Sequence, residues 1–158
     1  MSTKPCGVTL LHPGDIALGE HGDRFETLLG SCVSIILTDP RRTVGAMCHI
    51  VHARAAPRGS QHDTTYAQAA FDAMVARLRA RGLAAHLCDA FVIGGGNMFP
   101  RLDPNASIGD DNVARAKALL AAHRIRLIGQ DVGGNFYRRA RWSVGPAAPE
   151  VLLTKTEQ

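Results

Sequence analysis

Hydrophobic positions along the chain predict several short strands. Residues 33–37 (Val-Ser-Ile-Ile-Leu) are rich in β-branched side chains and predict a buried strand. The sequence Asp39-Pro40-Arg41-Arg42 suits a type I turn, and residues 44–51 predict the returning strand of a hairpin. Other strands are predicted at residues 91–93, 125–128, 139–144 and 151–154, the last two joined by a turn at Gly145-Pro146.

Two segments repeat apolar residues at helical spacing. The first carries Ala67, Ala70, Phe71, Met74, Val75 and Leu78. Asp63-Thr64-Thr65 supplies N-cap candidates for this helix, and Gly82 suits its end. A second helix is predicted over about residues 111–123. Two helices among five or more strands predict an α/β (α+β) sandwich with mixed, largely antiparallel sheets.

Composition indicates one globular domain over residues 1–158, with a core at about 8–154 and flexible ends. The chain is 46% hydrophobic and 20% charged, as in ordinary folded domains. Its apolar runs are too short for membrane insertion, and its first residues do not resemble an export signal. We therefore expect a cytoplasmic protein with reduced cysteines.

The net charge of +4 comes from 15 arginines and three lysines and favours an acidic partner. Aromatic residues make up only 5% of the chain, which argues against a surface that stacks nucleic-acid bases. The basic-aromatic cluster at residues 136–142 is interpreted as a solvated strand edge, and no nucleic-acid partner is expected.

The predicted hairpin places a cysteine beside a histidine. If Asp39 and Arg42 flank a symmetric turn, Cys32 lies directly opposite His49, with Cβ atoms about 4.5–5.5 Å apart. An imidazole at that distance can take the thiol proton, so the two form a nucleophile–base pair. A bulged turn would separate them, and a buried structural role stays open for each. Backbone N–H groups near Ser31, where a glycine-containing loop enters the strand, could bind an oxyanion.

The remaining cysteines show no comparable arrangement. Cys48 precedes His49 and faces the other side of its strand, while Cys6 and Cys88 lack a nearby partner. The spacing of Cys48, His49 and His52 matches no zinc pattern, so we expect neither a metal nor a cofactor.

Six segments together resemble the CheD family, the chemoreceptor glutamine deamidases of bacterial chemotaxis. They follow the family's order from about residue 8 to 154: Thr27–Val33, Gly45–His49, Tyr66-Ala67, Gly94-Gly95 with Met98-Phe99, Ile108-Gly109 with Asn112, and Asp131–Gly134. The sequence departs from the family at Tyr137, where a glycine is usual, and this puts the shape of the nearby loop in doubt.

The resemblance implies a sandwich of the cytotoxic-necrotizing-factor type with a Cys–His hydrolase site. Cys32 matches the family nucleophile and His49 its histidine. The third site residue is a threonine, which matches Thr27, although counting without a gap from some relatives leads to Glu26. The implied reaction is attack of the Cys32 thiolate on a receptor glutamine, followed by hydrolysis of a thioester.

The same resemblance implies partners and leaves alternatives. The substrate would be the cytoplasmic helices of a chemoreceptor, and a CheC-type phosphatase would bind at residues 94–99, including Gly94, Gly95, Met98 and Phe99. A non-catalytic chemotaxis adaptor of the same fold is one alternative. An RNA-binding module using Arg138, Arg139 and Arg141 is another.

Overall fold

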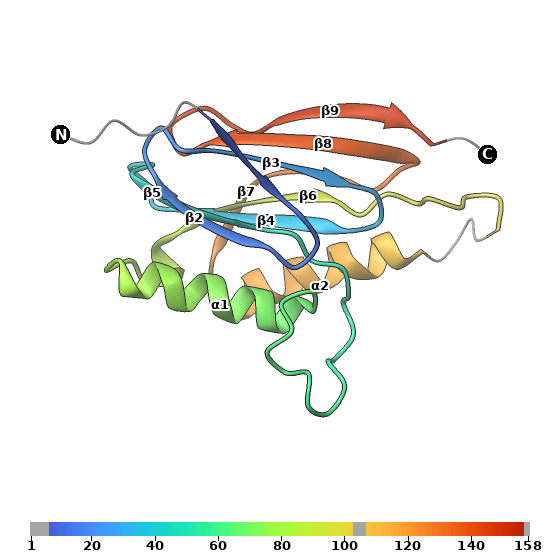
Figure 1. The fold of residues 1–158 in the computed structure, drawn as a ribbon, viewed down its shortest axis with the longest axis horizontal. Helices are drawn as coiled ribbons and strands as arrows, with labels where there is room; N and C mark the ends of the chain where they lie inside the picture. Colours follow the sequence, from blue (N-terminus) through green and yellow to red (C-terminus); the bar gives the residue numbers. More distant parts are fainter. Residues whose placement is uncertain (1–6, 103–106, 157–158) are drawn as a thin grey trace.

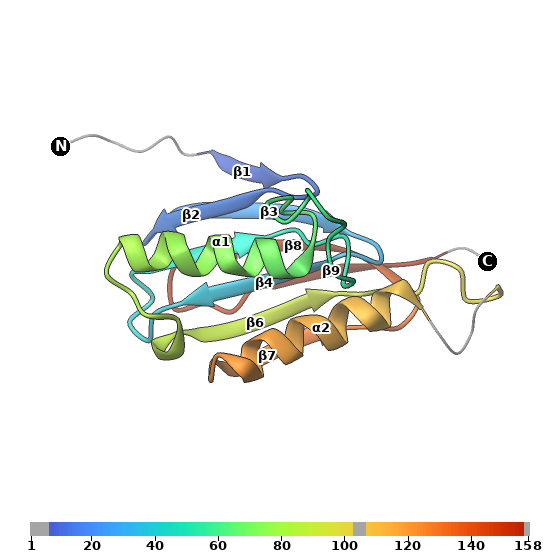
Figure 2. The same cartoon turned by 90° about the horizontal axis from the view of Figure 1, so that it is seen from below.

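The fold consists of two stacked β-sheets with two helices on the outer face of one of them (Figure 1). The computed structural model describes residues 7–102 and 107–156. The four-stranded sheet has the order β1-β3-β8-β9 and the five-stranded sheet the order β2-β5-β4-β6-β7. Figure 2 shows α1 and α2 lying across the five-stranded sheet. The expected sandwich is therefore confirmed.

The elements have the following bounds. The four-stranded sheet contains β1 (Val8–Leu11), β3 (Arg24–Leu29), β8 (Phe136–Ser143) and β9 (Glu150–Lys155). The five-stranded sheet contains β2 (Ile16–Glu20), β4 (Val33–Thr38), β5 (Val44–Cys48), β6 (Asp89–Gly94) and β7 (Arg126–Val132). The helices are α1 (Ala67–Ala80), the 3-10 helix η1 (Ala85–Leu87) and α2 (Ile108–Ala122). The pairs β1–β3 and β6–β7 are parallel, and the other pairs are antiparallel.

Two apolar layers hold the sandwich together. Between the helices and the five-stranded sheet, Ile35 and Leu37 of β4 pack with Phe71 and Met74 of α1. Between the two sheets, Ile36 of β4 belongs to the other cluster. Alternate residues of β4 thus enter different layers, and all six of its positions are buried. This explains why residues 35–37 of β4 (Ile-Ile-Leu) form an unbroken apolar run rather than an alternating pattern. In the described part of the chain, no helix has the length and apolar character needed to cross a membrane.

Both helices begin at positions different from those predicted. Helix α1 starts after Tyr66, which makes no side-chain cap. Asp63 instead accepts hydrogen bonds from Thr65 in a turn that precedes the helix. Helix α2 starts at Ile108, three residues before the predicted start, because the Ser107 side chain accepts a hydrogen bond from the Asp110 amide. The predicted end of α1 is confirmed, since Gly82 follows it with a positive φ of 83°.

The predicted register of the β4–β5 hairpin is wrong by two residues. Leu37 pairs with Ala46 rather than with Val44, and Val33 forms a bridge with Ile50. The turn is longer than expected because Arg42 adopts a positive φ of 59°. In addition, the Asp39 carboxylate accepts hydrogen bonds from the amides of residues 43 and 44.

The basic-aromatic cluster is not a strand edge. It forms β8, which lies between β3 and β9 inside the four-stranded sheet. Arg138, Ala140 and Trp142 are buried against the other sheet, while Arg139 and Arg141 point outward. Arg138 donates to Asp131 and to the Gly133 carbonyl, and Arg141 pairs with Glu26. These partners occupy two of the three arginines that the RNA-binding alternative requires.

Candidate active site

Thr27 and His49 meet between the two sheets. Thr27 lies on β3 and is 0% exposed, and His49 directly follows β5 and is 4% exposed. Thr27 Oγ1 is 2.7 Å from His49 Nδ1 and 2.8 Å from the Leu11 carbonyl oxygen. The backbone of His49 is held on its other side, where its N–H donates to the Asp15 carbonyl and its carbonyl accepts from Gly14.

These contacts determine which imidazole nitrogen carries the proton. A threonine hydroxyl has one proton, and Thr27 donates it to the Leu11 carbonyl. Its oxygen must then accept from His49, so Nδ1 carries the hydrogen of the neutral ring. The lone pair of neutral His49 is consequently at Nε2, where it can act as a base.

Cys32 lies close to His49, although not directly opposite it. Between the pairs Ile36–Met47 and Val33–Ile50, the register places Ser34 opposite His49. Cys32, two residues before Ser34, is then a diagonal neighbour on the same face, with a typical separation of about 7–8 Å between Cα atoms. Cys32 packs against the apolar cluster between the sheets and is partly exposed. No hydrogen bond joins its thiol to His49 among the described residues.

Burial favours the neutral forms of both side chains. It raises the pKa of the Cys32 thiol above its usual value. It lowers the pKa of His49, an effect that the negative charge of Asp15 partly offsets. Both shifts favour a thiol beside a neutral imidazole at neutral pH.

The glycines at the end of β6 and directly after it hold the backbone around Cys32. The Gly95 amide donates to the Cys32 carbonyl, and the Gly96 amide donates to the Gly30 carbonyl. A Cβ atom on Gly94 would lie 2.3 Å from the Cys32 carbonyl oxygen. Gly94 and Gly95 are buried, so they offer no surface for a partner, contrary to the sequence-based expectation. Through these contacts the glycines support the loop that precedes β4.

The neighbouring candidates Glu26 and Ser31 lie in different places. Glu26 is on the outer face of β3 and pairs with Arg141, so the structure brings Thr27 rather than Glu26 to His49. Ser31 is in the loop before β4, and its carbonyl accepts from the Asn112 side chain. None of the hydrogen bonds of the described residues uses the amide N–H of Ser31 or Cys32.

The other cysteines lie away from this face, and Cys6 is outside the described residues. Cys48 is fully buried on the helix side, with its pKa raised by burial to about 12. Cys88 is also buried, and its pKa is raised to about 11, mainly by burial. Within residues 7–102 and 107–156, no cluster of three His, Cys, Asp or Glu side chains could hold a metal ion.

An apolar surface adjoins the loop that carries Cys32. Phe99, Leu102 and Ile108 are 67%, 84% and 67% exposed. Met98 and Phe99 help to line a cavity of about 130 Å³ that also includes Ser31. Of the residues expected to contact a partner, Met98 and Phe99 are therefore accessible beside the site.

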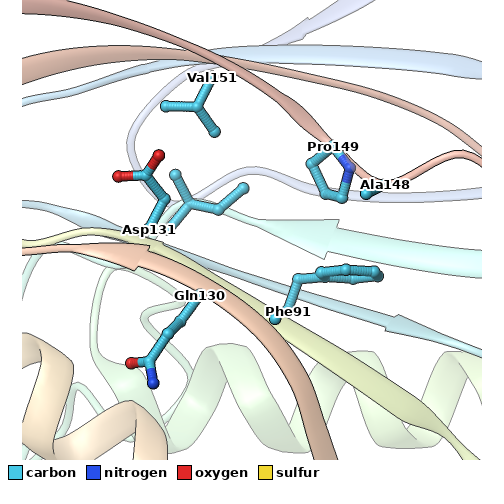
Figure 3. A pocket seen from close by; sticks show the side chains of 8 residues that line it. Phe91, Gln130, Asp131, Ala148, Pro149 and Val151 are labelled. Atoms are coloured by element: carbon cyan, nitrogen blue, oxygen red, sulfur yellow. The ribbon is translucent and has the colours of Figure 1, made fainter.

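A different cavity, of about 300 Å³, opens between the sheets beside β7 (Figure 3). In Figure 3, the Asp131 carboxylate points toward Val151, and the Phe91 ring lies across from Pro149. Gln130 points away, toward the helices. Neither Cys32 nor His49 lines this cavity, so it is separate from the candidate active site.

Residue-based reasoning assigned no role to two buried polar residues near Cys32. Ser34 is 0% exposed, and its hydroxyl has no hydrogen-bond partner among the described residues. Asn112 is 1% exposed and lies on the same side of α2 as buried Ala116 and Leu119. A polar side chain at an apolar helical position is the sequence signal that could have singled out Asn112.

Comparisons with known proteins agree on one family. Residues 52–147 match the family model described as CheD chemotactic sensory transduction. A probable chemoreceptor glutamine deamidase CheD of Pseudomonas savastanoi pv. phaseolicola is 36% identical over 85% of this chain and 78% of its own length. A similarly named protein of Dechloromonas aromatica is 37% identical over 91% of this chain and 87% of its own. One from Methanococcus vannielii is 33% identical over 77% and 79%.

Proposed function

The chain belongs to the CheD family, and from this we propose that it deamidates glutamine side chains of chemoreceptors to glutamate, with Cys32 as nucleophile. The observation that supports this most directly is the Thr27–His49 bond, because it leaves Nε2 of His49 as a base on the face that carries Cys32. The reaction releases ammonia and takes place on the cytoplasmic helices of the receptor, so the protein acts in the cytoplasm.

The first half of the reaction forms a thioester. Cys32 Sγ attacks the side-chain carboxamide carbon of glutamine while Nε2 of His49 accepts the thiol proton. The carbonyl oxygen becomes an oxyanion, which the amide N–H groups of Ser31 and Cys32 bind. His49 then gives its proton to the leaving nitrogen, ammonia departs, and the C–S bond of the thioester remains.

The second half releases the product. Neutral His49 removes a proton from water, and the resulting hydroxide attacks the thioester carbon. The C–S bond breaks, and the proton on His49 returns to the Cys32 sulfur. The net change is glutamine plus water to glutamate plus ammonia, which needs no cofactor or metal.

The burial of the pair affects how the nucleophile is activated. A raised Cys32 pKa and a lowered His49 pKa make a resting thiolate–imidazolium pair unfavourable. We therefore propose that the proton moves to His49 as the sulfur attacks, which is general-base catalysis. This places the proton transfer in the transition state, where Thr27 stabilises the imidazolium through the Nδ1–H bond.

Receptor binding is proposed at the apolar surface beside the Cys32 loop. Phe99 and Ile108 offer exposed apolar side chains to a helix, and a CheC-type phosphatase would compete for the same surface. Arginines supply most of the positive charge of the chain, which favours helices rich in glutamate and glutamine.

Mass spectrometry of a receptor cytoplasmic fragment tests the proposal. Wild-type protein should convert specific glutamines to glutamate, each gaining about one mass unit, and Cys32→Ala should convert none. Cys48→Ala is the matched control, because Cys48 is a buried cysteine on the other face. Turnover by Cys32→Ala would contradict the assignment of the nucleophile. Binding without turnover by the wild-type protein would favour the adaptor.

A further inference from the structure

Asn112 connects the loop that carries Cys32 to the segment that follows His49. Its side-chain Nδ2 donates to the carbonyl oxygen of Ser31 at 3.0 Å and to that of Val51 at 3.1 Å. A side-chain amide has two N–H donors, so both are used. Val33 and Ile50, which lie further inward on the two segments, are bonded to each other through their backbones. Asn112, on α2, thus links the two chain segments at the end of this strand pair.

The bond to Ser31 also determines the direction of the following amide. The peptide bond between Ser31 and Cys32 is trans, and in a planar trans peptide the C=O and N–H groups point in opposite directions. The Ser31 carbonyl points to Asn112 on α2, which packs on one face of the five-stranded sheet. The Cys32 N–H therefore points away from α2, toward the face where His49 meets Thr27.

The peptide on the other side of Cys32 is held as well. The Cys32 carbonyl accepts from the Gly95 amide at 2.8 Å, so both peptide planes flanking the cysteine are fixed. Its own N–H has no partner among the described residues and remains available to a ligand. An amide that is oriented in advance, with no bond to break, is what stabilisation of an oxyanion requires.

We propose that Asn112 is a positioning residue that aims the Cys32 amide at the oxyanion of the tetrahedral intermediate. The proposal rests on the proposed function, with Cys32 as nucleophile. A hydrogen bond that forms fully only with the oxyanion contributes to the transition state and not to substrate binding. Loss of Asn112 therefore lowers kcat and leaves KM unchanged.

Alkylation of Cys32 provides a second, independent readout. Iodoacetamide reacts with the sulfur by displacing iodide from a saturated carbon, and no oxyanion forms in that step. The alkylation rate depends on the thiolate and on its access to the reagent, not on the direction of the amide N–H. If an Asn112 variant is impaired only in positioning this amide, its Cys32 is alkylated at the wild-type rate.

Two variants remove the donors in different ways. Asn112→Leu keeps a similar volume without polar atoms, and Asn112→Asp keeps the shape but can only accept hydrogen bonds when ionised. Asp111→Asn, on an exposed position of the same helix, is the control and should match the wild-type protein. We expect kcat for receptor deamidation to fall by about 10²-fold in both Asn112 variants, as on removal of an oxyanion-hole donor. KM and the alkylation rate between pH 7 and 9 should stay within about twofold.

Two other kinetic results would overturn the proposal. A kcat within about threefold of wild type in a folded variant would overturn the proposal. A parallel fall in kcat and alkylation rate would also overturn it, because that pattern indicates a general structural role. Far-ultraviolet circular dichroism identifies a variant that fails to fold, and the other variant then decides. Cys32→Ala is measured alongside: if it retains turnover, the proposed nucleophile is wrong, whereas an inactive Cys32→Ala with normal Asn112 variants removes only the positioning role.

Discussion

Thr27 and His49 belong to different sheets, and the hydrogen bond from Nδ1 of the imidazole to the threonine hydroxyl crosses the interface between them. The same threonine bonds to Leu11 at the end of β1, so the ring is oriented by two strands of the opposite sheet. The orientation of the candidate base is thus a property of how the sheets pack. It is not fixed by the strand that carries the histidine.

Replacing Thr27 should impair the histidine. Thr27→Val keeps the branched shape but removes the acceptor, which leaves a buried N–H of His49 without a partner. We expect a loss of about 1–3 kcal/mol in the free energy of unfolding and a fall of about 10–10²-fold in kcat. Thr27→Ser keeps the hydroxyl and should retain most activity. Equal activity of the valine and serine variants in the deamidation assay would refute this role.

Acid should destabilise the protein through His49. Burial lowers the pKa of folded His49 below its value of about 6.5 in the unfolded chain, so below that pH the unfolded state binds more protons. Stability is therefore fully present above about pH 6.5 and falls as the pH drops toward the folded pKa. Urea unfolding at several pH values between 5 and 7.5 should show this loss in wild type. It should be smaller in His49→Gln, while His86→Gln at an exposed position serves as the control.

The cysteines should differ in reactivity. In a Cys6→Ser background, iodoacetamide at pH 8 should label Cys32 faster than Cys48 or Cys88. Cys32 is partly exposed, whereas the other two are buried with pKa values of about 12 and about 11. Burial both raises the pKa of Cys48 and Cys88 and keeps the reagent from their sulfur atoms, so Cys32 should be labelled fastest of the three. Peptide mapping of the folded protein gives the rates, and denatured protein should lose the difference. Comparable labelling of Cys48 in the folded protein would show that the core opens readily.

A methyl group on Gly94 should disturb the Cys32 loop. Gly94 has a φ of 114°, and an added Cβ would lie 2.3 Å from the Cys32 carbonyl oxygen. Gly22 is the matched control, because its φ is 94° but nothing lies within 4 Å of an added Cβ. Gly22→Ala should cost roughly 1–3 kcal/mol from backbone strain, and Gly94→Ala should cost more and abolish deamidation. Urea unfolding together with the activity assay checks both; equal effects of the two substitutions would contradict the close contact.

The sequence predicted the elements whose apolar pattern is simple. Strand β4 is buried at every position, so its composition alone identifies it. The strands β1, β2 and β3 were missed, since their exposed residues and the glycine in β2 weaken the pattern. In β3, Phe25, Thr27 and Leu29 do alternate inward, but a threonine is not recognised as a core position by hydrophobicity.

The hairpin shows why a site needs tertiary information. Its strands were predicted, but the register depends on the left-handed conformation of Arg42 and on the side-chain bonds of Asp39, which composition does not reveal. Because the shift is two residues, Cys32 and His49 still share a face. The family resemblance supplied Thr27, and the structure brings that residue to His49.

The order of the elements along the chain has a consequence during synthesis. Thr27 and His49 leave the ribosome early, but α2 and β8, which support the Cys32 loop and flank β3, come after residue 107. Until they have emerged, β3 lacks its antiparallel neighbour and the Cys32 amide lacks the constraint from Asn112. Contacts between such distant segments are slow to form, because closing the long intervening loop costs conformational entropy. On the proposed mechanism, Cys32 therefore gains its oriented amide only when nearly the whole polypeptide has been translated.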